Sequence, residues 1–331
     1  MDTDVAGIGN ALVDALVRID NEDVLAELGL TRGQMHPVDH GRWTEVYERL
    51  ESLGVEIHPG GSCANTIATL ALLGTQSILC GQVGEDEFGK NYAQQMTDTC
   101  GNNGLRLSPD GNTGKCLSII STKDAERTLV TDLGAATNLT GVGDFEGWIR
   151  NSRLLHVTGY LFLGGPMAKT AWEAMDVAKE AGVPISVDAA DPFVINSVKE
   201  DMWRALTDYA DLAFLNEEEA AALTGKTEAE ALVEVANHVH TPVVKLGSRG
   251  SLILQENEII HVGIHAANAI DTTGAGDTYA AGFIHGWLRG WPLTRCADLG
   301  ARLAALTVSQ IGAVCRDRSA IAEALAVSEP A

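Results

Sequence analysis

Apolar and polar positions alternate in a regular way through the second half of the chain. Short apolar runs, which predict buried strands, lie near residues 154–158, 184–188, 211–215 and 242–246. Between and after them lie longer stretches whose apolar positions repeat at helical spacing, near 167–181, 197–208, 217–224 and 227–238. This alternation of strands and helices is typical of a parallel sheet that helices cover on both faces.

The first half of the chain mixes such elements with segments richer in β-formers. Strands are expected at 5–9 and 77–83, and helices at 39–53, 62–73 and 88–100. Two β-rich segments, roughly 11–38 and 113–135, do not fit the alternation, and the second contains a predicted hairpin. We expect these two segments to form a small separate sheet, inserted into one domain that spans residues 1–331. A last hairpin is expected over 251–262, followed by helices over 293–310 and 319–327.

Composition narrows the class of protein. The chain has 331 residues, of which 45% are hydrophobic, so it has enough apolar residues for a large core. Its 23 basic and 45 acidic residues give a net charge of 23 − 45 = −22. A surface that acidic repels nucleic acids and anionic membranes, and we expect neither as a partner. The six cysteines form no C-x-x-C pair and no long apolar segment is present, which predicts a cytoplasmic protein with free thiols.

One segment nearly matches a phosphate-binding motif. Residues 84–91 follow the P-loop pattern G-x-x-x-x-G-K-[ST], except that Asn91 replaces the hydroxyl residue. The segment also holds three carboxylates, which would repel phosphates. We therefore interpret it as an acidic turn that leads into a helix.

The most informative stretch is residues 271–278, Asp-Thr-Thr-Gly-Ala-Gly-Asp-Thr, which we call the octet. It opens a run with helical spacing, so Gly274 and Gly276 lie where a helix begins. Unpaired N–H groups and the helix dipole favour an anion there, and glycines allow a close approach of the backbone. Asp277 falls in the first turn, beside that anion. An ordinary helix start would explain a lone Gly-Ala-Gly-Asp, but the full octet before small residues is more specific.

Two other polar groups stand at predicted helix starts. The Gly-Gly turn at 60–61 precedes Ser62, which is expected to cap a helix from whose first turn Asn65 projects. Asn216 follows an apolar strand, and Glu219 lies three residues later on the same side of a helix. Taken alone, the pair of Asn216 and Glu219 is explained by a capping box.

Together and in this order, the three motifs resemble the PfkB family of carbohydrate and nucleoside kinases, which has the ribokinase-like fold. The resemblance covers nearly the whole chain, and both family signatures are present, at 60–74 and 271–284. It implies a three-layer α/β/α fold with a mainly parallel central sheet, and a lid formed by the small sheet. It further implies a kinase that uses ATP and Mg²⁺, acts on a small sugar or nucleoside, and is a monomer or homodimer.

Within the family, the chain looks most like the adenosine-kinase branch. Residues 9–14 resemble that branch's Gly-Asn-x-x-x-Asp opening, and the distance from there to the Gly-Gly turn also fits. Ribokinases usually carry a lysine inside that turn, where this chain has Ser62 and Cys63. The contacts to the acceptor that the resemblance implies are Asn10, Asp14, Gln34, Gly60, Gly61 and Asn65.

The resemblance also implies a mechanism. Asp277 would take the proton of a primary hydroxyl as that hydroxyl attacks the γ-phosphate of ATP, a step that needs orientation more than a strong base. The backbone amides of Gly274, Ala275 and Gly276 would stabilise the transferring phosphoryl group. Mg²⁺ would be held through water by Asn216 and Glu219. The implied contacts to ATP are Lys245, Gly247, Thr272, Gly274, Gly276 and Gly312. K⁺ near Asp271 and Thr273 is a further option, and Arg127 is either a phosphate contact or, as we expect, a solvated side chain.

The acceptor stays open between two hypotheses. In a nucleoside kinase, with adenosine first and inosine or guanosine next, Gln34 would meet the base. In a kinase of a free sugar, such as ribose, fructose or a keto-deoxy acid, Gln34 would only pack within the lid. Aromatic residues are few, at 5%, although three could stack on a base: Tyr160, Phe162 and Phe193. A non-catalytic binding protein is a third hypothesis, which the intact Asp277 and glycines disfavour.

Overall fold

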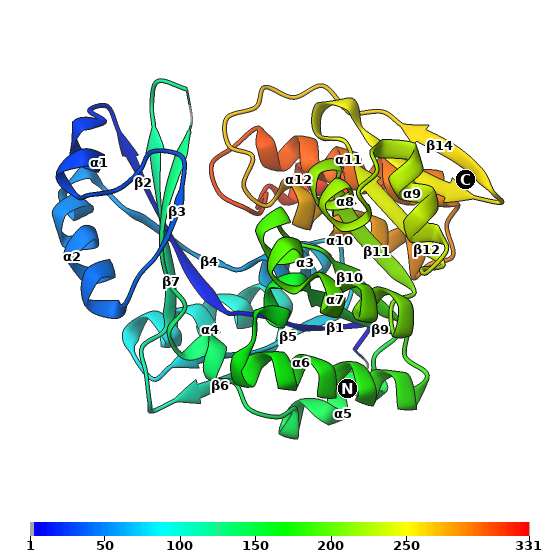
Figure 1. Cartoon of the computed structure of the whole chain (residues 1–331), viewed down its shortest axis with the longest axis horizontal. Helices are drawn as coiled ribbons and strands as arrows, with labels where there is room; N and C mark the ends of the chain where they lie inside the picture. The colour runs from blue at the N-terminus through cyan, green and yellow to red at the C-terminus, as the bar shows by residue number, and fades with distance from the viewer. Residues whose placement is uncertain (1–2, 125, 331) are drawn as a thin grey trace.

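The larger of two sheets forms the centre of the molecule (Figure 1). The computed structural model describes residues 3–124 and 126–330. Over these residues the large sheet has nine strands, in the order β14 (Glu258–Val262), β13 (Ser251–Gln255), β12 (Thr241–Lys245), β11 (Leu212–Asn216), β10 (Ile185–Asp188), β9 (Leu154–Thr158), β1 (Val5–Ile8), β5 (Ser77–Gly84) and β6 (Gly104–Ser108). Neighbours are parallel from β12 through β6, whereas β13 and β14 pair antiparallel.

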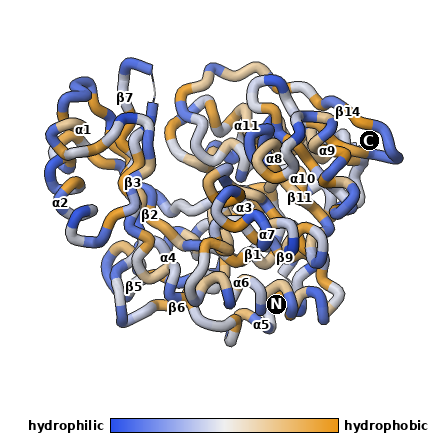
Figure 2. Tube along the Cα trace, in the orientation of Figure 1, coloured by the Kyte–Doolittle hydropathy of each residue, from blue (hydrophilic) through white to orange (hydrophobic). Residues whose placement is uncertain are grey.

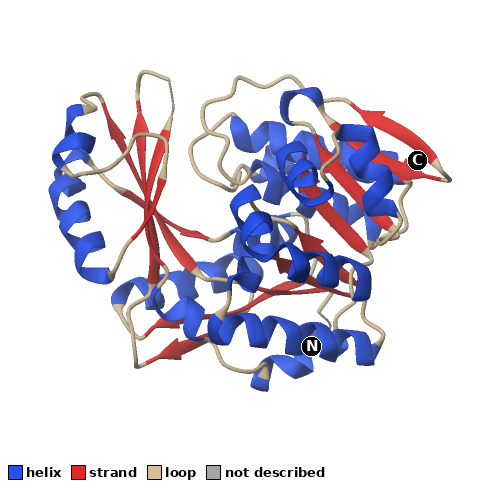
Figure 3. Cartoon of the chain, in the orientation of Figure 1, coloured by secondary structure: helices blue, strands red, loops and turns tan. Residues whose placement is uncertain are grey.

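Helices cover both faces of the large sheet, which gives the three layers that the sequence predicts (Figure 3). One face packs against α5 (Glu146–Asn151), α6 (Gly165–Ala181), α7 (Pro192–Asp208), α8 (Glu217–Thr224) and α9 (Glu228–Ala236). The other packs against α3 (Ser62–Leu72), α4 (Glu87–Cys100), α10 (Ala275–Trp287) and α11 (Leu293–Val308), with α12 (Arg318–Ser328) beyond them. Because both faces are covered, strands such as β5 and β9 are buried throughout and read as continuous apolar runs.

The smaller sheet stands to one side of this core, on the left in Figure 1. Its order is β3 (Met35–Pro37), β8 (Arg127–Asp132), β7 (Gly114–Ser121), β2 (Leu12–Ile19) and β4 (Glu56–Gly60). Side chains alternate between its faces. Ala15 and Val17 pack outward against α1 (Asp23–Glu27) and α2 (His40–Leu50), while Asp14 lies on the opposite face. In Figure 2 apolar positions concentrate around the strands of the large sheet, and the small sheet carries mixed positions.

Short 3-10 helices complete the connections. They are η1 (Glu51–Leu53), η2 (Gly134–Asn138), η3 (Gly143–Phe145), η4 (Gly159–Leu163) and η5 (Gly247–Arg249). The described residues contain no helix long and apolar enough to cross a bilayer.

Most of the expected elements are present, with three differences. The small sheet also contains β4, which lies outside the segments 11–38 and 113–135, because β4 pairs antiparallel with β2. Two elements, β6 and α5, have no counterpart among those expected. The edge strand β6 has only two apolar residues besides its glycine, Leu105 and Leu107, and α5 has only six residues, so neither forms a clear apolar pattern. The near-match to a P-loop is a turn into α4, which Asp86 caps through the amide of Gly89.

Parallel pairing brings three polar residues to one edge of the large sheet. Asp188, Asn216 and Lys245 are the last residues of β10, β11 and β12. Asn216 lies directly opposite Lys245 in the strand register. The carboxyl ends of neighbouring parallel strands form a common edge, which is where open α/β sheets place their ligands.

Candidate active site

The octet begins helix α10 as the sequence predicts. Gly274 is the N-cap with φ of +73°, a conformation that disfavours side chains, and a Cβ there would overlap the carbonyl of Ala313. Among the described residues, no side chain caps this helix. The amide of Ala275 donates to the carbonyl of Thr272 at 3.3 Å, whereas the amides of Gly276 and Asp277 have no backbone partner in the described chain and are available to an anion.

Asp277 is held by the start of helix α3. Its two carboxylate oxygens accept from Ser62 Oγ at 2.6 Å and from Asn65 Nδ2 at 2.8 Å. Burial raises the pKa of Asp277 to about 6, against the hydrogen bonds from Ser62 and Asn65, which lower it. The predicted capping role of Ser62 is wrong: Gly61 is the N-cap, and Ser62 donates to Asp277 instead. Sequence reasoning missed this contact because the two residues are 215 positions apart.

Asp14 lies across from Asp277, on the small sheet. Gly60 makes room for it, since a Cβ at Gly60 would overlap the Asp14 carboxylate. Burial raises the pKa of Asp14 to about 7, and the charges of Asp277 and Asp271 add to the effect. Asp14 accepts no hydrogen bond from the residues that the structure describes. A half-buried carboxylate in that condition suits hydroxyl donors from a ligand.

Two amide oxygens close to this site are also without partners. The Oδ1 atoms of Asn10 and Asn65 are buried and accept no hydrogen bond within the described chain. Buried polar atoms are normally satisfied, and such exceptions call for an explanation. Gly61 lies between these residues in space, with φ of +94°, and a Cβ there would overlap the carbonyl of Asn10. The structure thus brings Asn10, Gly60, Gly61 and Asn65 close to Asp14 and Asp277.

Asp271 ties the octet to the loop that follows α11. Its Oδ1 accepts from the amide and the hydroxyl of Thr273, at 2.9 and 2.6 Å, and its Oδ2 accepts from the amide of Gly312 at 3.0 Å. Arg127, from β8 of the small sheet, lies 3.5 Å from Asp271 Oδ1 and donates to the hydroxyl of Thr273. The expectation that Arg127 is solvated is therefore wrong. The contact joins residues 146 positions apart, and no local pattern reveals it.

Asn216 and Glu219 form the capping box that the sequence allows. Asn216 donates from its backbone and side-chain nitrogens to Glu219 at 2.7 and 2.6 Å, and the amide of Glu219 donates to Asn216 Oδ1 at 2.8 Å. Glu219 is only 2% exposed, and burial raises its pKa while the charge of Lys245 opposes that shift. Asp188, which the sequence analysis did not single out, lies close enough to add its negative charge.

Two of the remaining predicted ATP contacts are tied to the site by contacts that the structure shows. Lys245 pairs with Asp188, and the amide of Gly312 donates to Asp271. Gly247 opens η5 just beyond β12. Gln34 is exposed directly before β3, and its carbonyl accepts from the amide of Leu129 at 2.9 Å.

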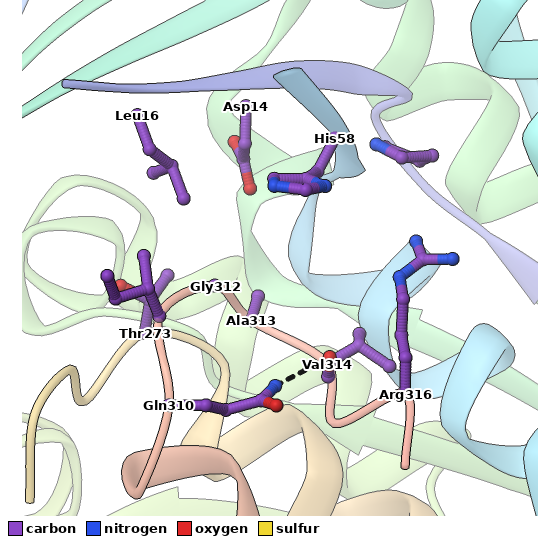
Figure 4. Close-up of a pocket in the computed structure, with 11 residues that line it drawn as sticks. Asp14, Leu16, His58, Thr273, Gln310, Gly312, Ala313, Val314 and Arg316 are labelled. Atoms are coloured by element: carbon purple, nitrogen blue, oxygen red, sulfur yellow. Dashed lines mark hydrogen bonds between the residues drawn. The ribbon is translucent and has the colours of Figure 1, made fainter. Parts of the chain in front are cut away.

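A cavity links the small sheet to the octet (Figure 4). Asp14 and His58 face it from the small sheet, and Thr273 and Gly312 face it from the core. Gln310 Nε2 donates to the carbonyl of Val314 at 2.9 Å and so braces the loop on the core side. Asp14, which is expected to bind the acceptor, and Thr273 of the octet therefore line the same cavity.

This fold and site define a small-molecule kinase of the ribokinase-like class. A profile of the pfkB family of carbohydrate kinases matches residues 39–317, and the chain belongs to that family. Its members transfer phosphoryl groups to alcohols, and the family implies ATP as the cosubstrate.

Similar proteins include both nucleoside and sugar kinases. Adenosine kinase of Saccharomyces cerevisiae is 26% identical, with 92% of this chain and 94% of that protein covered. The crystal structure of adenosine kinase from Sinorhizobium meliloti matches with a TM-score of 0.87 at 28% identity, covering 98% of this chain and 100% of that one. A probable sugar kinase from Rhizobium etli CFN 42 matches with a TM-score of 0.88 at 26% identity, with 99% of each chain covered.

Proposed function

We propose that this protein transfers the γ-phosphoryl group of ATP to the primary hydroxyl of a nucleoside, with adenosine as the first candidate. The observation that carries the proposal is the pair of carboxylates, Asp277 and Asp14, on the two lobes of one site. Asp277 lies at a helix start that favours an anion, and Asp14 accepts nothing from the described residues. A ribose offers a primary hydroxyl to the first and a vicinal diol to the second.

In the proposed reaction, Asp277 orients the primary hydroxyl and accepts its proton. Ser62 and Asn65 fix the carboxylate from behind, so that its geometry does not depend on the ligand. The first amides of α10, from Gly274 to Gly276, would stabilise charge on the phosphoryl group as it moves. Since phosphoryl transfer depends mainly on positioning and electrostatics, a carboxylate whose pKa is about 6 is an adequate base at neutral pH.

The residues present fit Mg²⁺ that is bound through water. Asn216 and Glu219 supply the hard oxygen atoms that Mg²⁺ prefers, while both oxygens of Glu219 also accept hydrogen bonds from Asn216 and the side-chain oxygen of Asn216 accepts from the amide of Glu219. The described residues contain no group of three or more His, Cys, Asp or Glu side chains placed to hold a metal directly. When bound, Mg²⁺ would supply positive charge to the phosphates of ATP.

The fit to K⁺ is poorer. Asp271 already accepts from Thr273 and Gly312, and the guanidinium of Arg127 lies beside it. A second cation in that position would be repelled, and we derive no step through K⁺.

Support for a base on the acceptor comes from apolar side chains that the protein leaves exposed. Leu163 and Phe193 are 42% and 61% exposed on η4 and α7, which pack together. In the same η4, burial and the charges of Asp191 and Asp277 raise the pKa of Tyr160, so this element borders the site. An exposed apolar surface on an element that borders a polar site suits a ligand with one flat apolar part.

The second candidate is a kinase of a free sugar. It is favoured by the full-length similarity to the probable sugar kinase of Rhizobium etli, whose TM-score of 0.88 is within 0.01 of the 0.87 for the adenosine kinase structure. In that case Asp14 would still bind a diol of the sugar. The exposed apolar side chains would contact no part of the ligand, because a free sugar has no base.

A screen of acceptors tests the proposal. ATP consumption is measured with adenosine, inosine, guanosine, ribose, fructose and a keto-deoxy sugar acid, each with the same amount of protein and Mg²⁺. We expect the highest kcat/KM with a nucleoside. Turnover with a sugar but with no nucleoside would overturn the nucleoside proposal, and absence of turnover with every acceptor would favour a binding protein.

Acid should inactivate the enzyme by protonating Asp277. Its pKa is raised to about 6, so the carboxylate is ionised above that pH and loses its charge as the pH falls through it. We expect kcat at saturating acceptor to be level near pH 8 and to fall about tenfold per pH unit well below 6. The measurement is kcat against pH with both substrates saturating. A constant kcat down to pH 5 would contradict the role of Asp277 as the base.

A further inference from the structure

An ion pair that the proposed mechanism does not yet use lies beside the octet. Lys245 Nζ is 3.0 Å from Asp188 Oδ2, and the two side chains are only 14% and 6% exposed. The other oxygen of Asp188 accepts from the amide of Ala190 at 3.0 Å, which fixes the carboxylate. Burial lowers the pKa of Lys245, but the charges of Asp188 and Glu219 outweigh that effect and leave the pKa raised. The side chain is thus held as an ammonium ion.

A buried ion pair of this kind is not explained by stability. The cost of removing two charges from water can exceed their mutual attraction, so apolar residues of similar volume often do as well or better. The two residues end β10 and β12, with β11 between them, where two apolar side chains of similar volume would avoid the cost of burying charge. We therefore look for a functional role of the ion pair between Lys245 and Asp188.

The ammonium group of Lys245 lies against the first turn of α10. A Cβ on Gly276 would lie 3.1 Å from Lys245 Nζ. The ammonium group therefore lies directly against the octet, and the absence of a side chain at Gly276 leaves room for it. The positive charge of Lys245 also lowers the pKa of Asp277. Lys245 is thereby placed at the phosphate end of the site, whereas the family resemblance puts it beside adenine.

We propose that Lys245 binds the phosphoryl group in transfer at the start of α10, and that Asp188 is a positioning residue that holds Lys245 there. This inference rests on the proposed kinase reaction and adds a cation to it. The bond between the γ-phosphorus and the bridging oxygen breaks, and its electron pair goes to the β-phosphate of ADP. The bond from the acceptor oxygen to phosphorus forms, and the hydroxyl proton passes to Asp277. Lys245 keeps its protons and donates hydrogen bonds to a non-bridging oxygen of the group that moves.

The local charges agree with this role. The charge of Lys245 interacts with three carboxylates, those of Asp188, Glu219 and Asp277. One cation therefore lies among three acidic side chains. Without Lys245, the triphosphate would meet the carboxylates of Asp188, Glu219 and Asp277 with no cationic side chain beside them, in a protein whose net charge is −22. Lys245 with the amides of α10 offsets that field where the phosphoryl charge is greatest.

Substitutions of the two residues test the proposal. Lys245→Met removes the charge and keeps the length, and Lys245→Arg restores a cation. We expect Lys245→Met to lower kcat about 100-fold or more, in the range found when one preorganised donor is lost, with the KM for the acceptor within about threefold of wild type. Lys245→Arg should recover part of that loss. A Lys245→Met variant with wild-type kcat would overturn the proposal.

A pH profile separates a positioning role of Asp188 from a structural one. The groups that act on Asp277 include Ser62 and Asn65, which donate to it, the carboxylates of Asp188 and Asp14, and the ammonium of Lys245. The charge of Asp188 raises the pKa of Asp277 and that of Lys245 lowers it. We expect the acid limb of kcat to move to lower pH in Asp188→Asn and to higher pH in Lys245→Met. Shifts in the same direction, or none, would refute the assignment.

Folding is controlled with a double variant. Lys245→Met combined with Asp188→Leu leaves neither charge alone in the interior, so we expect a folded protein, checked by its thermal unfolding, that is as slow as Lys245→Met. A folded double variant with wild-type kcat would again overturn the inference. Every assay uses whichever acceptor the wild-type protein phosphorylates. A preference for sugars would therefore end the nucleoside proposal and leave this test intact.

Discussion

Replacing Asp277 by Asn should lower kcat about 1,000-fold and leave the affinity for ATP within about threefold of wild type. The asparagine keeps the shape of the side chain and can still contact Ser62, but it cannot take the hydroxyl proton. Binding of ATP depends on the amides of α10 and on the remaining polar residues, which the change does not touch. The measurement is steady-state kinetics beside direct titration with ATP.

The same variant provides its own folding control. Burial raises the pKa of Asp277 from 3.8 to about 6, so the ionised carboxylate favours the unfolded chain at pH 8. The neutral asparagine removes that penalty, and its melting temperature at pH 8 should be no lower than that of wild type. A folded Asp277→Asn protein that keeps more than a tenth of the wild-type kcat would remove Asp277 from the chemistry.

Replacing Asp14 by Asn should raise the KM for the acceptor by about 10- to 100-fold, with kcat and the KM for ATP changed much less. Each hydrogen bond to a charged group is worth about 1.5–3 kcal/mol, and the carboxylate can accept from both hydroxyls of a diol. The matched control is a nucleoside without the 2′- and 3′-hydroxyls. The affinity of wild-type protein for that compound should be as low as the affinity of Asp14→Asn for the complete nucleoside. Removing the two hydroxyls should lower the affinity of Asp14→Asn little further. Independent, additive losses would show that Asp14 does not contact the diol.

A second readout of Asp14→Asn is stability against pH. The pKa of Asp14 is raised from 3.8 to about 7, so the folded chain holds that proton more tightly than the unfolded chain does. Below pH 3.8 the side chain is neutral in both states and costs nothing, and the cost is complete above pH 7. The variant should therefore melt at a higher temperature than wild type at pH 8, with the difference vanishing near pH 4.

Features confined to short stretches of chain could be predicted from the sequence. The strand and helix rhythm from β9 to α9, the start of α10 at the octet and the capping box of Asn216 and Glu219 all depend on neighbours a few residues away. The family resemblance then placed Asp14 and Asn65 near Asp277, and the structure brings these residues together.

Features that depend on distant contacts could not be predicted. Ser62 looked like a helix cap because its real partner, Asp277, is far along the chain. Arg127 looked like a solvated hairpin residue because nothing in 123–132 indicates Thr273 and Asp271. Asp188 ends an ordinary apolar strand, and only the arrangement of the parallel strands puts it beside Lys245. In each case the local sequence is explained by a common role, such as a helix cap or a solvated side chain. The structure instead gives the side chain a partner that is distant in sequence.

The hydrogen bonds from Ser62 and Asn65 to Asp277 have a consequence for folding during synthesis. They join residues 215 and 212 positions apart, so helix α3 is made long before the helix that supplies its partner. Contacts of such sequence separation complete native packing late. A nascent chain that ends before residue 271 therefore contains the residues expected to bind the acceptor but not the octet expected to bind phosphate.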